Sequence, residues 1–212
     1  MLSYAILIDA GFLKRKLGSQ ESPLTGSVVE GFIDQLRESD CLSQHHLHRI
    51  YFYDAPPLET RVRRPLGGGG LDFGRSDLSR VNKALHDELR HIPYVALRLG
   101  DLMFRGWQIG RDLLQNAPGP IQVSADDLKP NVQQKGVDMR IGLDIASLTL
   151  KRQVTGIVLV TGDSDFVPAM KFARREGAQL FLVTFGHAVR PELREHADVL
   201  IDIDPKAVRA QS

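Results

Sequence analysis

The feature that most constrains the fold is an alternation of short apolar runs with amphipathic segments along the chain. A continuous apolar run bounded by turn residues is typical of a strand buried on both faces, whereas apolar residues at helical spacing predict a helix. The expected strands are residues 4–8, 48–53, 94–99, 157–160, 179–184 and 199–203, and the expected helices are residues 28–38, 77–90, 137–150, 166–175 and 191–196. This alternation favours an α/β fold of three layers, with a mostly parallel central sheet and helices on both faces.

The segments between these elements are less regular. Residues 65–74 contain the run Gly67 to Gly70 and predict a mobile loop, because glycine-rich chain is costly to order. Residues 100–111 suggest an added β-hairpin, and residues 116–136 lack periodicity, which is typical of a long connection. We expect a single domain over residues 1–204 with a variable insertion at about 58–130, followed by a C-terminal tail over residues 205–212.

The helix expected at residues 137–150 is apolar over a wide surface. Met139, Leu143, Ala146 and Leu150 follow helical spacing, and Ile141, Ile145 and Leu148 widen the apolar face. We expect this helix to pack on the sheet.

Composition limits the class of protein. A chain of 212 residues with 42% hydrophobic residues can bury one sizeable core. The single cysteine, Cys41, excludes an internal disulfide and suits a reducing compartment. Charges interrupt every apolar run, and the first ten residues lack the basic start of a signal peptide. We therefore expect a soluble, cytoplasmic protein that does not enter a membrane.

Basic side chains gather in the middle of the sequence. The net charge of +1 neither requires nor excludes a nucleic-acid partner. The segment from Glu59 to Arg111, however, contains ten basic residues and six acidic ones. This excess predicts either a modest basic patch or an ordinary solvated surface.

Aspartates follow two of the expected strands. Asp9 ends the first apolar run, and Asp163 and Asp165 follow the run at 157–160, while Asp138 begins the helix at 137–150. Ligands of parallel sheets gather at the carboxyl ends of the strands. Crowded carboxylates raise one another's pKa values unless a cation intervenes, and hard oxygen ligands suit Mg²⁺ or Mn²⁺. The pattern favours a divalent-cation site.

Structural roles for the same aspartates remain open. An aspartate at a strand-to-helix turn commonly caps the helix, so Asp163 and Asp165 are equally compatible with a cap. Asp138 also suits a first-turn acid that compensates the helix dipole. We expect Asp144 to pair with Arg140 on the helix surface rather than to bind a metal. A structural zinc site is excluded by the lone cysteine.

In combination, several stretches resemble the NYN domain, including the LabA-like (DUF88) proteins, of the PIN-like nuclease superfamily. They are residues 4–13, Lys135-Gly-Val-Asp138 with Asp144, Thr161-Gly-Asp-Ser-Asp-Phe166 and Leu193-Arg-x-x-Ala-Asp198. The resemblance runs from about residue 3 to 204 and is loose between about 58 and 130. One departure is that Ala10-Gly11-Phe12 follows the first aspartate, where numerous NYN domains have a glycine and an asparagine.

The resemblance implies a PIN-like fold and a ribonuclease that depends on a divalent cation. Its catalytic acids and Mg²⁺ or Mn²⁺ ligands would be Asp9, Asp138, Asp163 and Asp165. Thr161 and Ser164 would support these ligands or the turn, since neither motif contains a histidine that could activate a nucleophile.

The expected substrate is single-stranded or flexible RNA, because an acidic site needs flanking cations to hold phosphates. The candidate RNA-binding residues are Lys135, Arg61, Arg63 and Arg64. Trp107 and Tyr53 are candidate stacking platforms, although core packing is the favoured role for each taken singly.

Other functions fit the sequence less well. A haloacid-dehalogenase-type phosphatase needs a second acid at the position of Gly11, and a Toprim domain needs a glutamate at the position of Asp9. A non-catalytic RNA-binding or regulatory module on the same scaffold remains the alternative, although the intact set of acids favours the nuclease. The sequence is also compatible with a homodimer.

Overall fold

The computed structural model describes residues 2–110, 113, 119–186 and 189–210. Its centre is a six-stranded sheet in the order β10-β9-β8-β1-β2-β5, in which every neighbouring pair is parallel. The strands are β1 (Ser3–Asp9), β2 (His46–Asp54), β5 (Val95–Leu99), β8 (Gly156–Val160), β9 (Gln179–Thr184) and β10 (Val199–Asp202). Strands β1 and β8, at the middle of the sheet, are almost wholly buried, as their continuous apolar runs predict.

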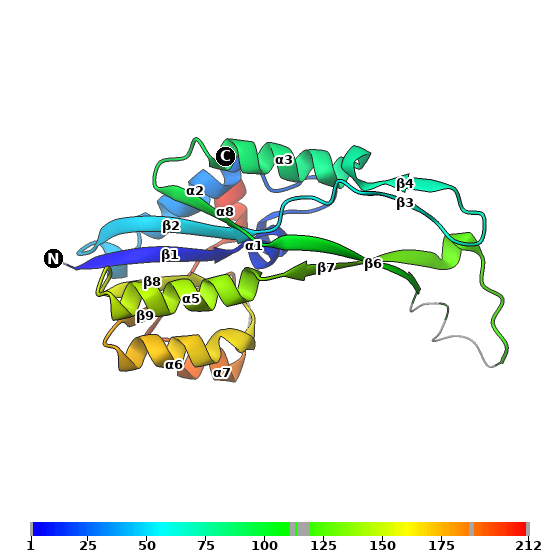
Figure 1. The fold of residues 1–212 in the computed structure, drawn as a ribbon. Helices are drawn as coiled ribbons and strands as arrows, with labels where there is room; N and C mark the ends of the chain where they lie inside the picture. Colours follow the sequence, from blue (N-terminus) through cyan, green and yellow to red (C-terminus); the bar gives the residue numbers. More distant parts are fainter. Residues whose placement is uncertain (1, 111–112, 114–118, 187–188, 211–212) are drawn as a thin grey trace.

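Helices cover both faces of this sheet (Figure 1). One face packs against α1 (Ala10–Leu17), α2 (Gly26–Arg37), α3 (Asp77–Leu89) and α8 (Pro205–Ala210). The other face packs against α5 (Val137–Leu150), α6 (Val167–Arg175) and α7 (Pro191–Glu195). The two faces of the sheet thus bury separate hydrophobic clusters, and the predicted three-layer α/β fold is confirmed.

Helix α5 packs on the sheet through a different row of apolar side chains from the row that begins with Met139 and Leu143. Ile141 and Ile145 are fully buried, and Leu148 is nearly so, whereas Met139 and Leu143 are 72% and 62% exposed. The helix is apolar on most sides, so spacing alone could not identify the face that meets the sheet.

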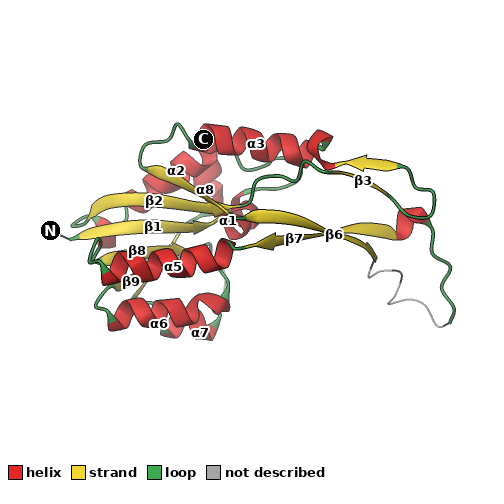
Figure 2. Ribbon diagram, viewed as in Figure 1, coloured by secondary structure: helices red, strands yellow, loops and turns green. Residues whose placement is uncertain are grey.

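An arm projects beyond the sheet and is formed by the two ends of the insertion expected at about 58–130, whereas α3 and β5, between those ends, belong to the main fold (Figures 1 and 2). The arm consists of two antiparallel ribbons, one formed by β3 (Arg61–Arg63) and β4 (Gly70–Asp72), the other by β6 (Asp101–Ile109) and β7 (Leu128–Lys135). The expected mobile loop at 65–74 is therefore the turn and second strand of a short hairpin.

Within the described residues, the prediction of a β-hairpin at residues 100–111 is wrong. Residues 101–109 form one strand, and its partner β7 lies inside the segment expected to be a long connection. Residues 111–112 and 114–118 lie outside the described part of the chain. The pairing was hidden because β7 is polar and joins β6 across many intervening residues.

Aromatic side chains hold the two ribbons of the arm together. The rings of Phe73 and Phe104 are 5.7 Å apart, and Phe104 meets Trp107 edge to face at the same distance. The indole nitrogen of Trp107 donates to the backbone carbonyl of Arg63 at 3.2 Å, and the Arg64 guanidinium lies 5.6 Å from the indole ring. A half-buried aromatic cluster therefore joins the two ribbons of the arm.

Two helices lie where none was expected. Helix α1 starts directly after Asp9, and α8 occupies most of the segment predicted as a C-terminal tail. Val208 of α8 is fully buried, and the Arg209 guanidinium donates to the carbonyl oxygens of Leu17 and Ser22. The end of the described chain is thus part of the layer that contains α1 and α2.

Within the described ranges, none of the helices combines the length and apolar character required to cross a membrane.

Candidate functional site

The direction of the chain reverses between β1 and β8, at the centre of the sheet. From β1 the chain continues to β2 and β5 on one side, and from β8 it continues to β9 and β10 on the other. Such a switch point opens a crevice at the carboxyl ends of the strands, where ligands bind in α/β folds. Ile8 pairs in register with Val160, so Asp9 and Thr161 follow side by side at this edge.

Asp9 joins the end of β1 to the start of α1. Its Oδ1 accepts a hydrogen bond from the backbone nitrogen of Phe12 at 3.2 Å, and its Oδ2 accepts one from the Thr161 hydroxyl at 3.3 Å. Asp9 therefore caps α1, a helix that the sequence did not predict. Burial raises the pKa of Asp9, although these hydrogen bonds and the charge of Arg15 act in the opposite direction.

Asp163 and Asp165 lie on the turn that follows β8. The Asp163 nitrogen donates to the Thr161 hydroxyl at 3.2 Å, and the Asp165 nitrogen donates to Oδ1 of Asp163 at 3.0 Å. Asp163 thus caps the short helical turn Ser164–Phe166. Both aspartates are exposed, so their carboxylates remain accessible to solvent. A cap uses one carboxylate oxygen and leaves the other available to a cation.

Asp138 lies on α5, which covers the other face of the sheet from α1. It is the second residue of α5, which follows β7 through Gly136, a glycine in the left-handed region at φ 76°. Burial raises the pKa of Asp138, and the negative charges of Asp9, Asp163 and Asp165 raise it further. The four aspartates predicted as ligands therefore share one electrostatic neighbourhood, although they come from three separate parts of the chain.

The arrangement suits a hydrated cation better than a closed protein cage. Within the described part of the chain, no three acidic, histidine or cysteine side chains are close enough together to surround a metal ion. Mg²⁺ usually keeps several waters and is bound through only one or two carboxylates. Carboxylates that repel one another at the edge of the sheet match that chemistry, and Mn²⁺ accepts the same oxygen ligands.

Thr161 and Ser164 connect the site to its surroundings. Thr161 is buried, and its hydroxyl bridges the Asp9 carboxylate and the Asp163 backbone. The Ser164 hydroxyl accepts a hydrogen bond from the Arg190 guanidinium at 2.8 Å.

Cations that the sequence did not single out lie beside the aspartates. Arg15, Lys16 and Arg190 line a hollow that also includes Asp163. Arg15 and Lys16 lie on α1. If Asp9 had been recognised as the N-cap of a helix, the sequence would have placed both residues one to two turns into that helix, near the site. No local signal connects Arg190 with them.

The predicted RNA-binding residues divide between two places. Lys135 is the exposed last residue of β7 and lies close to the start of α5. Arg61 and Arg63 are exposed on β3, which Figure 1 shows out on the arm. Arg64 is half-buried and forms an ion pair with Asp126 at 3.1 Å. The arginines are therefore separated from the aspartates.

Tyr53 and Trp107 pack against other side chains, which was the favoured role of each, and the ion pair expected for Asp144 is corrected. Tyr53 is fully buried and donates to Oδ2 of Asp144 at 2.8 Å, so it is not a stacking platform. Asp144 forms an ion pair with Arg98 at 3.1 Å rather than with Arg140. Trp107 is occupied by packing within the arm. For Asp144, contacts with Arg98 and Tyr53 from distant strands replace the pairing within the helix that spacing suggested.

A buried ion-pair network lies at the end of the neighbouring strand. Asp54 ends β2 and is 5% exposed, and its Oδ2 accepts hydrogen bonds from Lys14 at 2.5 Å and His86 at 2.8 Å. Lys14 also donates to Asn82 at 2.7 Å. Burial acts to raise the pKa of Asp54, but the His86 hydrogen bond and the Lys14 charge together hold it below its usual value. Asp54 therefore links α1, α3 and β2.

Comparison with known proteins identifies a family over most of the chain. The NYN domain matches residues 73–204. This segment contains Asp138, Asp163 and Asp165, whereas β1 and Asp9 precede it.

The curated relatives are themselves uncharacterized. Protein y4oD of Sinorhizobium fredii is 34% identical over 80 residues, which is 36% of this chain and 37% of the relative. Protein MJ0482 of Methanocaldococcus jannaschii is 25% identical over 126 residues, which is 58% of this chain and 50% of the relative. The chain thus matches half or less of the length of these relatives.

A solved structure is similar over nearly the whole length. It is a protein of unknown function, VPA0982, from Vibrio parahaemolyticus, with a TM-score of 0.52. The match covers 96% of this chain and 93% of the other, at 16% sequence identity. This similarity supports the fold and carries no information on activity.

Proposed function

Because the chain belongs to the NYN domain family of PIN-like nucleases, we propose that it hydrolyses phosphodiester bonds of RNA at a divalent-cation site. The observation that carries the proposal is the gathering of aspartates at the carboxyl ends of β1 and β8, where Thr161 links the Asp9 carboxylate to the Asp163 backbone. Burial, and then the charges of Asp9, Asp163 and Asp165, raise the pKa of Asp138 beside them. Capping accounts for Asp9 and Asp163 singly, but the repulsion among four gathered carboxylates is relieved by a bound cation. The motif set resembles the LabA-like branch most, and we propose membership of that branch.

The side chains divide the work between cation and substrate. Asp9, Asp138, Asp163 and Asp165 would hold Mg²⁺ or Mn²⁺, which supplies an oriented water and neutralises charge that develops on the phosphodiester. Thr161 holds the Asp9 carboxylate and the Asp163 backbone in a fixed relation through its hydroxyl. Lys135, Arg15 and Lys16 place positive charge around the acidic centre, where it attracts the phosphates of a strand.

The arm provides a second contact for a longer RNA. Arg61 and Arg63 alternate with Val62 on β3, so their side chains project from the same face of the strand. Both are exposed, and neither forms an ion pair with a described residue. We propose that they contact phosphates, so single-stranded or flexible RNA spans the distance from the arm to the aspartates.

Replacing both Arg61 and Arg63 with Ala should weaken RNA binding and lower its salt dependence. Each phosphate contact to a single strand contributes a slope of about 0.7 in log K against log salt, so loss of two contacts should reduce the slope by about 1.4. Fluorescence anisotropy of a labelled RNA at several salt concentrations measures this slope. Arg37→Ala, on α2, is the matched control and should leave it unchanged; an unchanged slope in the arm variant would exclude the contact.

Metal binding should stabilise the folded protein. A ligand that binds only the folded state at a hundredfold excess over its Kd adds about 2.7 kcal/mol to the free energy of unfolding. Asp138→Asn should raise the unfolding temperature without metal, because it removes a charge that the other three aspartates repel, and should reduce the response to Mn²⁺. Thermal unfolding with and without Mn²⁺ measures both effects.

The pH dependence follows from the same repulsion. The folded-state pKa of Asp138 is raised, so its stabilising protonation is complete below the unfolded value and is lost as pH rises through the folded value. The metal response should therefore appear as pH rises through this carboxylate range. Identical wild-type midpoints with and without saturating Mn²⁺ at neutral pH would show that the aspartates act only as caps and surface acids.

A further inference from the structure

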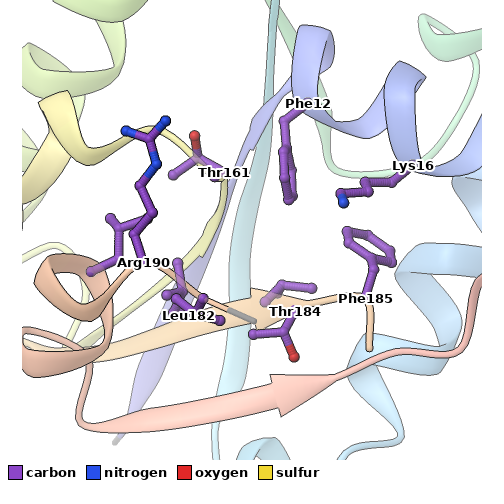
Figure 3. A pocket seen from close by; sticks show the side chains of 11 residues that line it. Phe12, Lys16, Thr161, Leu182, Thr184, Phe185 and Arg190 are labelled. Carbon is purple, nitrogen blue, oxygen red and sulfur yellow. The ribbon is translucent and has the colours of Figure 1, made fainter. Parts of the chain in front are cut away.

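A small cavity lies next to the aspartates, between α1 and the carboxyl end of β9. Its volume is about 190 Å³, and its wall includes Phe12, Lys16, Gly162, Thr184, Phe185 and Arg190. Figure 3 shows Phe12 and Lys16 across the cavity from Arg190, with Leu182 and Thr184 on the strand between them. No residue of this wall belongs to the proposed cation ligands.

The cavity is connected to the aspartates through a shallower hollow. That hollow shares Phe12, Lys16, Gly162 and Arg190 with the cavity, and it also includes Asp163 and Arg15. A group bound in the cavity would therefore lie beside a group bound at Asp163. This arrangement suits two adjacent parts of one molecule.

The interior of the cavity is apolar, and its two threonine hydroxyl groups already donate hydrogen bonds within the protein. The rings of Phe12 and Phe185 lie 5.8 Å apart at an interplanar angle of 54°. The Thr184 hydroxyl donates to Asp202 at 2.7 Å, and the Thr161 hydroxyl donates to Asp9 at 3.3 Å. The interior therefore favours a flat apolar ring over a group that needs many hydrogen bonds.

The rim of the cavity is cationic. Arg15, Lys16 and Arg190 form no ion pair with any described residue, and Arg190 donates only to the neutral Ser164 hydroxyl among the contacts described. The Lys16 ammonium lies 5.6 Å from the centre of the Phe12 ring. An apolar interior with a cationic rim matches a flat ring that carries a nearby phosphate.

We propose that this cavity is a base pocket, which takes one unpaired nucleobase of an RNA strand while Lys16 and Arg190 contact the neighbouring phosphate. The identity of the ligand as RNA rests on the proposed function. The volume is below the roughly 300–1,000 Å³ of typical small-molecule sites, which suits one base with its sugar and phosphate outside. Since the hydroxyls are engaged, the pocket binds the base by stacking and does not distinguish bases by their edges.

Gly162 allows Phe12 to form this pocket. A Cβ atom at position 162 would lie 2.6 Å from Cε2 of the Phe12 ring, so any larger residue displaces the ring.

The test compares two strands that differ in a single base. One RNA-like oligomer is abasic at every position, and the other carries one central 2-aminopurine; both are bound in EDTA, so cleavage is not required. Wild-type protein should bind the 2-aminopurine strand about tenfold more tightly, which is the order expected for one stacked base. Its fluorescence should change on binding.

Variants assign the difference to the pocket. Phe12→Leu keeps apolar packing and Gly162→Ala displaces the ring, and each should abolish the tenfold preference. Phe172→Leu, an aromatic change on α6, is the matched control and should keep it. Lys16→Met should weaken the binding of both strands about equally, since both strands carry phosphates.

The outcomes separate this proposal from the nuclease proposal. Equal affinity of the wild-type protein for the two strands overturns the base-pocket proposal, even if the protein cleaves RNA. A preference that survives both Phe12→Leu and Gly162→Ala overturns it as well. Displacement of the 2-aminopurine strand by adenosine monophosphate at equal or lower concentration also overturns it in favour of a free-nucleotide site. A preference that depends on Phe12 supports the pocket even if no cleavage is found.

Discussion

Replacing Asp163 with Asn should reduce RNA cleavage by about 100-fold or more without unfolding the protein, a loss typical of removing one electrostatic group from an active site. The amide oxygen of Asn can still accept the hydrogen bond from the Asp165 nitrogen, so the turn after β8 keeps its cap. The negative charge that would attract a cation is lost. Asp9→Asn should behave in the same way, because its amide oxygen can still accept from the Phe12 nitrogen.

The control for these variants is an aspartate away from the site. Asp34 lies on α2, is exposed, and forms only a long ion pair with Arg37 at 3.7 Å. Asp34→Asn should retain wild-type cleavage. Initial rates on a labelled RNA with Mg²⁺ or Mn²⁺, together with thermal unfolding, separate loss of activity from loss of fold. Full activity in both Asp9→Asn and Asp163→Asn would contradict the assignment of these carboxylates.

Replacing Asp54 with Ala should lower the free energy of unfolding by about 3 kcal/mol, the order found when one partner of a buried ion pair is removed. The change leaves Lys14 and the buried His86 without the carboxylate that both contact. The side chain of Lys14 is 27% exposed, so part of its charge can regain water, which keeps the loss at the lower end of that range. Urea unfolding at neutral pH measures the effect.

The acid dependence of stability provides a second readout for Asp54. Its folded-state pKa is lowered, so its contribution is present above the unfolded value and is lost as pH falls through the folded value. Wild-type protein should therefore lose stability in acid more steeply than Asp54→Ala. A double-mutant cycle with Lys14→Met isolates their coupling. A loss below about 1 kcal/mol with parallel acid limbs would mean that the network contributes little.

The central strands and the acids at their ends could be predicted because their signals are local. Residues 4–8 and 157–160 are continuous apolar runs, and the aspartates directly after them inherit their position from the strand. Helix α1 could not be recognised as easily, because Ala10 and Gly11 after Asp9 suggest a turn. In the structure Gly11 is helical and lies against the Asp9 carboxylate, where a Cβ would be 3.2 Å from Oδ1.

The remaining features depend on contacts between distant parts of the sequence. β6 pairs with β7, and this pairing places Lys135 next to Asp101 and leads the chain into Asp138. Phe12, Gly162 and Arg190 meet only because β1, β8 and β9 are neighbours in the sheet. The base pocket and the arm are consequently properties of the folded chain that periodicity does not reveal.

The measurement that tests the central claim most directly is cleavage of single-stranded RNA by purified protein as a function of divalent cation. We predict cleavage with Mg²⁺ or Mn²⁺, its loss in EDTA, its recovery when metal is restored, and little activity in Asp163→Asn under every condition. Cleavage that persists in EDTA or in Asp163→Asn would contradict a carboxylate-bound cation site. RNA binding by folded wild-type protein with no cleavage in either metal would instead identify a non-catalytic RNA-binding module.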